Sequence, residues 1–193
     1  MGIADSNVEF KFKSNKGRKR KILINGLTGT GKSTVAKKYC DKYKLNAVVF
    51  DIDDTNFAMS DRVIDIDYSL NGTALTNEIV GMIKQIPAEY DTIIIDGIDT
   101  LNDLLVPDGE GQIVYKKRSD NFKKILNTLK ESDRNLIFIG QKAMVMRDDD
   151  KEYSKTVMQL NNMVNFTYRC FVDDKGKFGT ECLKYRGKPE ELE

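Results

Sequence analysis

Residues 26–33 read Gly-Leu-Thr-Gly-Thr-Gly-Lys-Ser and fit the pattern Gly-x-x-x-x-Gly-Lys-[Ser/Thr] of a phosphate-binding loop. The apolar segment 21–25 directly before this loop predicts a short buried strand. Segment 33–43, directly after it, has apolar residues on one face and predicts a helix. Such a loop directs main-chain N–H groups and the positive end of the new helix at a phosphate group. The motif therefore requires an α/β domain in which a buried strand runs through a tight loop into a helix.

Each part of this loop has a separate expected task. The glycines let the backbone approach phosphate oxygens closely. Lys32 is expected to reach the β- and γ-phosphates, and the Ser33 hydroxyl is expected to ligate Mg²⁺. The alternative, a chance glycine-rich turn, does not explain the strand and the helix on either side. The predicted nucleotide-binding residues are Gly26, Thr28, Gly29, Thr30, Gly31, Lys32, Ser33 and Thr34.

Composition limits the class of protein and the chemistry that the chain can carry out. The chain has 193 residues, of which 32% are charged, and a net charge of +1, which fits one ordinary α/β domain. Histidine is absent from the sequence, which excludes histidine-based catalysis and histidine-ligated zinc. Three scattered cysteines without a Cys-x-x-Cys pair predict reduced thiols. Without a long apolar run or an apolar leader, we expect a cytoplasmic protein that does not contact membranes.

The two ends of the chain are polar. Residues 1–20 are expected to form a basic, flexible arm, residues 21–187 a single domain, and residues 188–193 a polar tail. The arm contacts DNA or RNA phosphates in one interpretation and is a solvated lead-in to the first strand in the other. Seven basic residues and no acidic residue lie between positions 11 and 21: Lys11, Lys13, Lys16, Arg18, Lys19, Arg20 and Lys21.

A cluster of carboxylates follows the second predicted strand, 47–51. It comprises Asp51, Asp53 and Asp54. The carboxyl ends of strands in an open α/β sheet are where ligands bind, and a carboxylate there can orient or deprotonate water. The alternative is a polar loop with helix-capping aspartates. We assign the water-positioning role to Asp53, with Asp54 as its rival.

Two further predicted strands also end in polar side chains. Segment 91–96 contains three consecutive isoleucines, typical of a strand covered on both faces, and ends in Asp96. Asp96 is expected to hold the Mg²⁺ shell opposite Ser33, although it could also cap a helix. Strand 135–140 is followed by Gln141, whose amide either contacts the γ-phosphate and the attacking water or caps a loop.

The remaining segments complete an α/β pattern. Residues 54–72 are expected to be an irregular connection, and 142–154 a mobile loop. Residues 173–176 are expected to form a hairpin turn, so the last two strands add an antiparallel edge to the sheet. The other predicted elements are helices at 73–86, 99–105, 112–130 and 154–159 and strands at 163–172 and 178–185.

Taken in order, these motifs resemble those of RecA-type P-loop ATPases, in particular small nucleotide-binding ATPases of phages, some of which act in single-strand annealing. Phe50-Asp51-Ile52-Asp53 resembles the strand end that supplies the catalytic carboxylate, where the family usually has Glu. Residues 93–101 resemble the Walker B segment, and residues 138–141 resemble the strand and amide that sense the γ-phosphate. Lys184 and Arg186 resemble the basic pair that some members insert into a neighbour's nucleotide site.

The resemblance implies a RecA-like, mostly parallel sheet flanked by helices and an ATPase that uses ATP and Mg²⁺. It further implies a homo-oligomer that acts on single-stranded DNA in recombination, in the host cytoplasm if the chain is phage-encoded. Lys32, Asp53 and Gln141 would then be the catalytic residues, and Ser33 and Asp96 the metal ligands.

Two other function classes remain open at this point. A small-molecule kinase fits the size of the chain and its Gly-Lys-Ser-Thr segment, but residues 107–120 offer only one arginine for a lid. A nucleotide-dependent binding module with little turnover fits the Asp in place of Glu at position 53. A GTPase is the least favoured, because the only Asn-Lys pair precedes the loop and lacks the Asp that would read guanine.

Overall fold

The computed structural model describes residues 19–55, 57, 62–109, 111–141, 160 and 162–185. Within them a seven-stranded sheet has the order β3-β2-β4-β5-β1-β6-β7. The strands are β1 (Lys21–Asn25), β2 (Ala47–Asp51), β3 (Val63–Ile64), β4 (Thr92–Asp96), β5 (Asn135–Gly140), β6 (Phe166–Val172) and β7 (Phe178–Tyr185). The helices are α1 (Lys32–Tyr43), α2 (Gly72–Gln85), α3 (Ile98–Leu104) and α4 (Gln112–Glu131).

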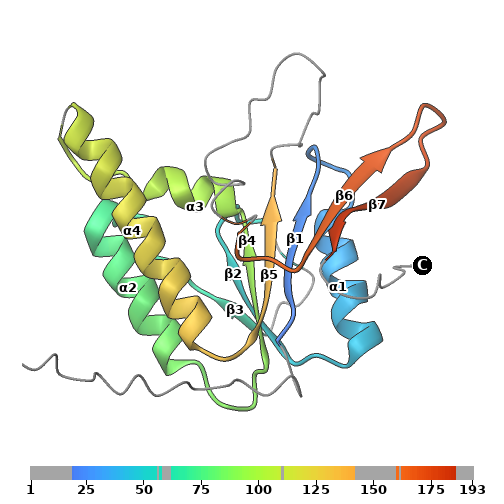
Figure 1. The fold of residues 1–193 in the computed structure, drawn as a ribbon, viewed down its shortest axis with the longest axis horizontal. Coiled ribbons are helices and arrows are strands. Elements are labelled where there is room, and N and C mark those ends of the chain that lie inside the picture. Colours follow the sequence, from blue (N-terminus) through green and yellow to red (C-terminus); the bar gives the residue numbers. More distant parts are fainter. Residues whose placement is uncertain are drawn as a thin grey trace, which may run out of the picture.

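Helices cover both faces of the sheet (Figure 1). On one face α1 packs through Ala36, Tyr39 and Cys40 against alternate residues of the central strands. On the other face α2, α3 and α4 bury a larger apolar cluster that includes Leu75, Ile79 and Phe122. Successive side chains of each strand point to opposite faces of the sheet. In β1, Ile22 and Ile24 therefore pack in the cluster on the α1 face, whereas Leu23 belongs to the opposite cluster. This explains why the central strands are continuously apolar, as the sequence of β4 predicts.

The expected fold class is confirmed. Six strands are parallel, and β7 pairs antiparallel with β6 at the edge. The hairpin turn at 173–176 closes where Gly176 N–H donates to the carbonyl of Asp173 (2.9 Å). The chain therefore forms a mostly parallel P-loop α/β domain with an antiparallel C-terminal hairpin.

Two expectations about elements need correction, and several others lie outside the described residues. The connection 54–72 is not wholly irregular, because Val63–Ile64 forms β3 at the sheet edge, a strand too short to give a periodic pattern. The strand expected at 163–172 begins at Phe166, because Met163 and Val164 are buried before it in a turn whose N–H groups donate to Leu160. The loop expected at 142–154 and the helix expected at 154–159 lie outside the described residues, as do nearly all of the arm and the tail.

The strand registers place the carboxyl ends of β1, β2, β4 and β5 side by side along one edge of the sheet, perpendicular to the outer strands. Asn25 of β1 pairs with Gly140 of β5, and Asp51 of β2 pairs with Asp96 of β4. Because these strands are parallel and in register, the segments that follow them emerge side by side. The phosphate-binding loop, the Asp51–Asp54 segment, Asp96 and Gln141 all belong to this edge.

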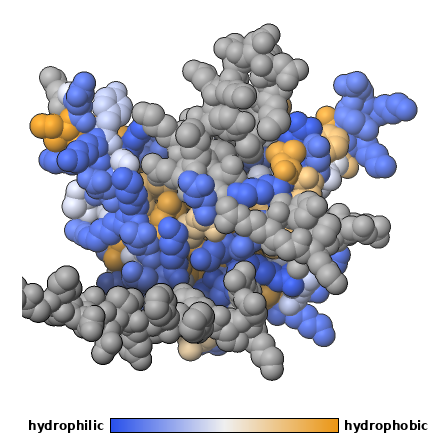
Figure 2. Space-filling view, in the orientation of Figure 1, coloured by the Kyte–Doolittle hydropathy of each residue, from blue (hydrophilic) through white to orange (hydrophobic). Residues whose placement is uncertain are grey.

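The molecular surface is largely hydrophilic in the view of Figure 2, with apolar residues gathered near the outer end of α4 and over the β6–β7 hairpin. Large exposed apolar side chains include Ile113 and Tyr115 on α4 and Val172 and Phe178 on the hairpin. No helix among the described residues combines the length and the apolar character that crossing a bilayer requires.

Candidate nucleotide site

The backbone of the phosphate-binding loop has a positive φ, which favours glycine, at Gly26, Gly29 and Gly31. Gly26 has φ +155°, and a Cβ there would lie 2.3 Å from the carbonyl oxygen of Cys170 on β6. Gly31 has φ +82° and caps the N-terminus of α1. Both conformations are costly for residues with a side chain. The glycines therefore set the close packing of the loop on β6 and the abrupt start of α1.

Lys32 is the first residue of α1, and its side chain turns back over the loop. Its side chain is buried, and Nζ donates a hydrogen bond to the carbonyl of Leu27 (3.0 Å). Burial lowers the pKa of Lys32, and the nearby carboxylates of Asp96 and Asp53 act in the opposite direction. The ammonium group is thus held over the loop, where a bound anion would stabilise its charge.

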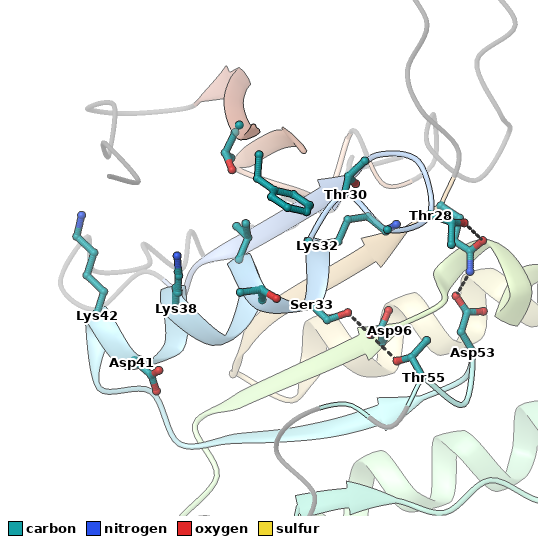
Figure 3. Close-up of a pocket in the computed structure, with 18 residues that line it drawn as sticks. Thr28, Thr30, Lys32, Ser33, Lys38, Asp41, Lys42, Asp53, Thr55 and Asp96 are labelled. Carbon is teal, nitrogen blue, oxygen red and sulfur yellow. Dashed lines mark hydrogen bonds between the residues drawn. The ribbon is translucent and has the colours of Figure 1, made fainter. Parts of the chain in front are cut away.

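Ser33 and Asp96 are brought together from β4 and α1. Ser33 Oγ donates to Asp96 Oδ2 (2.9 Å), and Thr55 Oγ1 lies 3.4 Å from the same oxygen (Figure 3). Burial raises the pKa of Asp96 to about 6; the neighbouring charges of Asp51 and Asp53 add to this effect, and the hydrogen bonds from Ser33 and Thr55 oppose it. A buried carboxylate among other carboxylates is an electrostatically strained arrangement that a bound cation relieves.

The donor set at this point fits Mg²⁺. A hydroxyl and a carboxylate are hard oxygen ligands, and Mg²⁺ takes one or two such protein ligands and completes its shell with phosphates and water. Among the described residues no group of three or more acidic or cysteine side chains could hold a metal by itself. An ion held by Ser33 and Asp96 would complete its shell with phosphate oxygens and water.

Asp53 and Gln141 meet beside the loop. Gln141 Nε2 donates to Asp53 Oδ2 (2.5 Å), and Thr28 Oγ1 of the loop lies 3.4 Å from Gln141 Oε1 (Figure 3). Asp51, in contrast, is buried and accepts bonds from the N–H groups of Thr55 and Phe57, so it stabilises the turn after β2. Asp54 is exposed at φ +49°.

One cavity of about 1020 Å³ joins these groups. Seven of the eight predicted nucleotide-binding residues line it, from Thr28 to Thr34, as do Asp53, Asp96 and Gln141. Gly26 is not among its lining residues, because it lies at the root of the loop against Cys170. Asp54 does not line the cavity either, so position distinguishes Asp53 from its rival.

Several lining residues were not found from the sequence. Of these, Thr55 could have been predicted from its position, since it directly follows the carboxylate cluster at the end of a buried strand. Phe178, whose side chain is 63% exposed, lies beside the loop, because a Cβ added to Gly31 would be 3.6 Å from its ring. Nothing in the local sequence links β7 to the loop. The remaining residues in this group are Val35, Lys38, Asp41 and Lys42 of α1 and Gly179 and Thr180 of β7.

The basic pair near the C-terminus does not belong to this cavity. Lys184 lies near the end of β7 and is not a lining residue, and Arg186 lies outside the described residues. Among the described lining residues none is an arginine. A role of the pair in the nucleotide site of a neighbouring subunit stays a prediction.

Comparison with known proteins agrees with this geometry. A family model described as an AAA domain (AAA_24) matches residues 18–170, most of the chain. The chain belongs to this AAA domain family. It is therefore a P-loop ATPase domain, as the motifs predict, and nucleotide binding is a property of its family.

The crystal structure of the flagellar accessory protein FlaH from Methanocaldococcus jannaschii is similar with a TM-score of 0.46 and 14% sequence identity. The match covers 86% of this chain and 78% of FlaH. No curated protein sequence matches this AAA domain chain.

Proposed function

We propose that this protein binds ATP with Mg²⁺ and hydrolyses it, and that it uses the energy to act on single-stranded DNA as an oligomer. The observation that supports the chemistry best is that one cavity is lined by Lys32, Ser33, Asp53, Asp96 and Gln141. These are a cation, a metal-ligand pair, a carboxylate and an amide, the set that phosphoryl transfer to water needs.

Binding of the triphosphate would use the loop and Lys32. The N–H groups of the glycine-rich loop and the start of α1 face the phosphates, and Lys32 exchanges its bond to Leu27 for a charge-assisted bond to a phosphate oxygen. Ser33 and Asp96 would hold Mg²⁺. When bound, this ion neutralises charge on the β- and γ-phosphate oxygens.

Hydrolysis would use the carboxylate of Asp53. Asp53 orients a water molecule in line with the γ-phosphorus and accepts its proton. A bond forms between the water oxygen and the γ-phosphorus, while the bond from that phosphorus to the β–γ bridging oxygen breaks. The bridging oxygen leaves with its electron pair as part of ADP, and the proton passes from Asp53 to the released phosphate. Gln141, which contacts both Asp53 and the loop, would respond to the presence of the γ-phosphate.

The nucleobase would lie on Phe178. This ring is exposed, belongs to the same cavity and lies next to Gly31. Stacking on an exposed aromatic ring suits a purine and brings little selectivity between purines. ATP is proposed over GTP because the only Asn-Lys pair in the sequence precedes the loop and lacks the Asp that would read guanine.

The finer biological role is inferred from the family resemblance and from the basic arm. Some RecA-type ATPases insert a basic pair into a neighbour's nucleotide site, and the lack of an arginine among the described lining residues agrees with a site that a neighbour completes through Lys184 or Arg186. The basic arm would supply phosphate contacts to DNA. A role in phage recombination or single-strand annealing is the pathway that this combination favours.

The test of the nucleotide site is Lys32→Ala. Loss of a charge-assisted bond worth about 1.5–3 kcal/mol weakens Mg-ATP binding by roughly 10- to 150-fold, because 1.4 kcal/mol is a factor of ten. Binding is measured by fluorescent ATP titration, and turnover by release of inorganic phosphate. Lys37→Ala, on the same helix but outside the cavity, is the matched control.

Three outcomes would count against this proposal. Equal ATP affinity of the Lys32 variant and the parent would show that the site is elsewhere. Phosphate transfer to a nucleoside or sugar faster than to water would identify a kinase. Tight ATP binding without measurable phosphate release in a single turnover would identify a binding module.

A further inference from the structure

The carboxylate of Asp53 is held from two sides. Thr100 Oγ1, on α3, donates to Asp53 Oδ1 (2.5 Å), and Gln141 Nε2 donates to Asp53 Oδ2 (2.5 Å). The residues that donate lie 47 and 88 positions along the chain from Asp53. A carboxylate that accepts a hydrogen bond at one oxygen from a hydroxyl on a helix has a defined orientation. Its other oxygen can change hydrogen-bond partners while this orientation is kept.

The corner between β4 and α3 is shaped around this carboxylate. Gly97 follows Asp96 and has φ +91°, and a Cβ there would lie 2.5 Å from Asp53 Oδ1 and 2.6 Å from its Cγ. Glycine at position 97 therefore lets the side chain of Asp53 lie directly against the backbone of the corner. The close approach brings Asp53 within reach of Thr100, one turn further along.

Asp99, the residue before Thr100, binds the backbone of Gln141. Asp99 is buried, and its Oδ2 accepts a hydrogen bond from the backbone N–H of Gln141 (3.2 Å). A Cβ on Gly140 would lie 3.0 Å from the same oxygen. Two consecutive residues of α3 thus contact the two groups that are proposed to act on the attacking water.

We propose that Thr100 is a positioning residue for ATP hydrolysis: its hydroxyl fixes Oδ1 of Asp53 so that Oδ2 is the oxygen that receives the attacking water. Gln141 then exchanges its bond to Oδ2 for one to the γ-phosphate or to that water, while Thr100 keeps the carboxylate in place. Asp99 supports this exchange by anchoring the backbone of Gln141. The inference rests on the proposed function, because it assigns a role within the same site.

Thr100 is not among the residues that line the cavity, so its proposed effect passes through Asp53. A residue that only stabilises α3 would change the amount of folded protein. A positioning residue changes kcat and leaves nucleotide affinity unchanged, because Asp53 contributes to the reaction and not to the grip on the phosphates. The proposal therefore predicts a separation of kcat from KM.

The experiment compares Thr100→Val, which keeps the branched shape and removes the hydroxyl, with Thr100→Ser, which keeps the hydroxyl. Thr100→Val is expected to lower kcat by about 10- to 100-fold, the range in which misplacing a reacting group by up to an ångström falls. The ATP dissociation constant should stay within about twofold of the parent value, and Thr100→Ser should retain kcat within about threefold. Thermal unfolding of each variant reports whether the fold is intact, and Thr100→Ala replaces Thr100→Val if the valine does not fold.

A double variant with Asp53→Asn completes the test. If Thr100 acts through Asp53, adding Thr100→Val to Asp53→Asn lowers kcat no further. An additional tenfold loss in the double variant would overturn the inference, as would parental kcat in Thr100→Val or parental kcat in Asp53→Asn.

Failure of the proposed function would look different. In that case the parent itself would release no phosphate from ATP, and there would be no reaction for Thr100 to support. Failure of the inference alone would leave an active parent, an impaired Lys32→Ala variant and a fully active Thr100→Val variant.

Discussion

At the scale of single residues, Asp96 illustrates how a buried carboxylate lowers the stability of the folded protein. Burial and the neighbouring carboxylates raise its pKa from 3.8 to about 6, so its charged form is disfavoured in the folded protein. Because the folded-state pKa is above the unfolded value, stability decreases as pH rises through 6. At pH 8 the cost is about 3 kcal/mol, since one pKa unit corresponds to 1.36 kcal/mol.

Asp96→Asn should therefore stabilise the protein when EDTA is present, by about 2–3 kcal/mol at pH 8. The gain should shrink as pH falls through 6 and vanish below about pH 4, where Asp96 is protonated in both states. Urea unfolding at several pH values measures it. Asp174→Asn, in the exposed hairpin turn, controls for the loss of one negative charge. A variant that is less stable than the parent at pH 8 would contradict the prediction, and the same variant should bind Mg-ATP more weakly.

Phe178 gives a second prediction at this scale. If its ring stacks on the base, Phe178→Ala should weaken ATP binding by about 1–3 kcal/mol, the range measured for stacking of a base on an aromatic side chain. Inorganic tripolyphosphate has no base, so its affinity should not change. Competition of each ligand with a fluorescent ATP analogue measures both affinities. Equal losses for the two ligands would mean that the ring shapes the loop and does not contact the base.

At the scale of elements, hydrogen bonds from side chains of one element hold the ends of other elements in place, as α3 and the segment after α2 show. The first turn of α3 contacts both Asp53 and Gln141, so the corner between β4 and α3 positions the residues that follow β2 and β5. At the opposite edge of the sheet, Arg134 donates to the carbonyls of Tyr90 and Ile86 (both 2.7 Å) and Pro87 (3.1 Å). It thereby satisfies carbonyl groups at the end of α2 and ties that end to β5.

Arg134→Ala should lower the free energy of unfolding by about 1.5–3 kcal/mol, because it leaves carbonyls without their charged donor. Arg134→Lys should recover only part of this loss, since an ammonium group lacks the planar fork that reaches several carbonyls. Urea unfolding measures both, and Lys130→Ala, on the exposed face of α4, is the control. A change below about 0.5 kcal/mol in Arg134→Ala would show that water replaces the guanidinium without cost.

At the scale of the whole molecule, the cavity is bounded by the phosphate-binding loop and α1, by residues at the ends of three parallel strands, and by the start of β7. It has no arginine among its described lining residues. A cation supplied by a neighbouring subunit is worth about 10³–10⁵ in rate in this chemistry. We therefore expect slow hydrolysis by the monomer and a rise in turnover per subunit with protein concentration or with added single-stranded DNA.

Phosphate release measured over a range of protein concentrations, with and without single-stranded DNA, tests this expectation. Lys184→Ala should reduce the stimulated rate and leave ATP binding to the isolated subunit unchanged. Lys177→Ala, an exposed residue on the same hairpin, is the control. Turnover per subunit that is independent of both protein concentration and DNA would exclude a site completed by a neighbour.

The sequence by itself determined the phosphate-binding loop, the order of the main elements and the acid at the end of β4. These signals are local: glycine spacing, apolar periodicity and a carboxylate after a buried run are visible within about ten residues. The boundaries of α2 and α4 differ by one residue from those expected, and β3 was missed because two residues carry no period.

Only the tertiary structure decided which distant residues share the site. Strand order, register and the packing of α3 bring Thr100 to Asp53, Thr55 to Asp96 and Phe178 to the loop. Each of these pairs joins segments whose own sequence gives no reason for the contact. Hydrogen-bond pairing between strands and the shape of the β4–α3 corner make the contacts, and neither can be read from the spacing of residues along the chain.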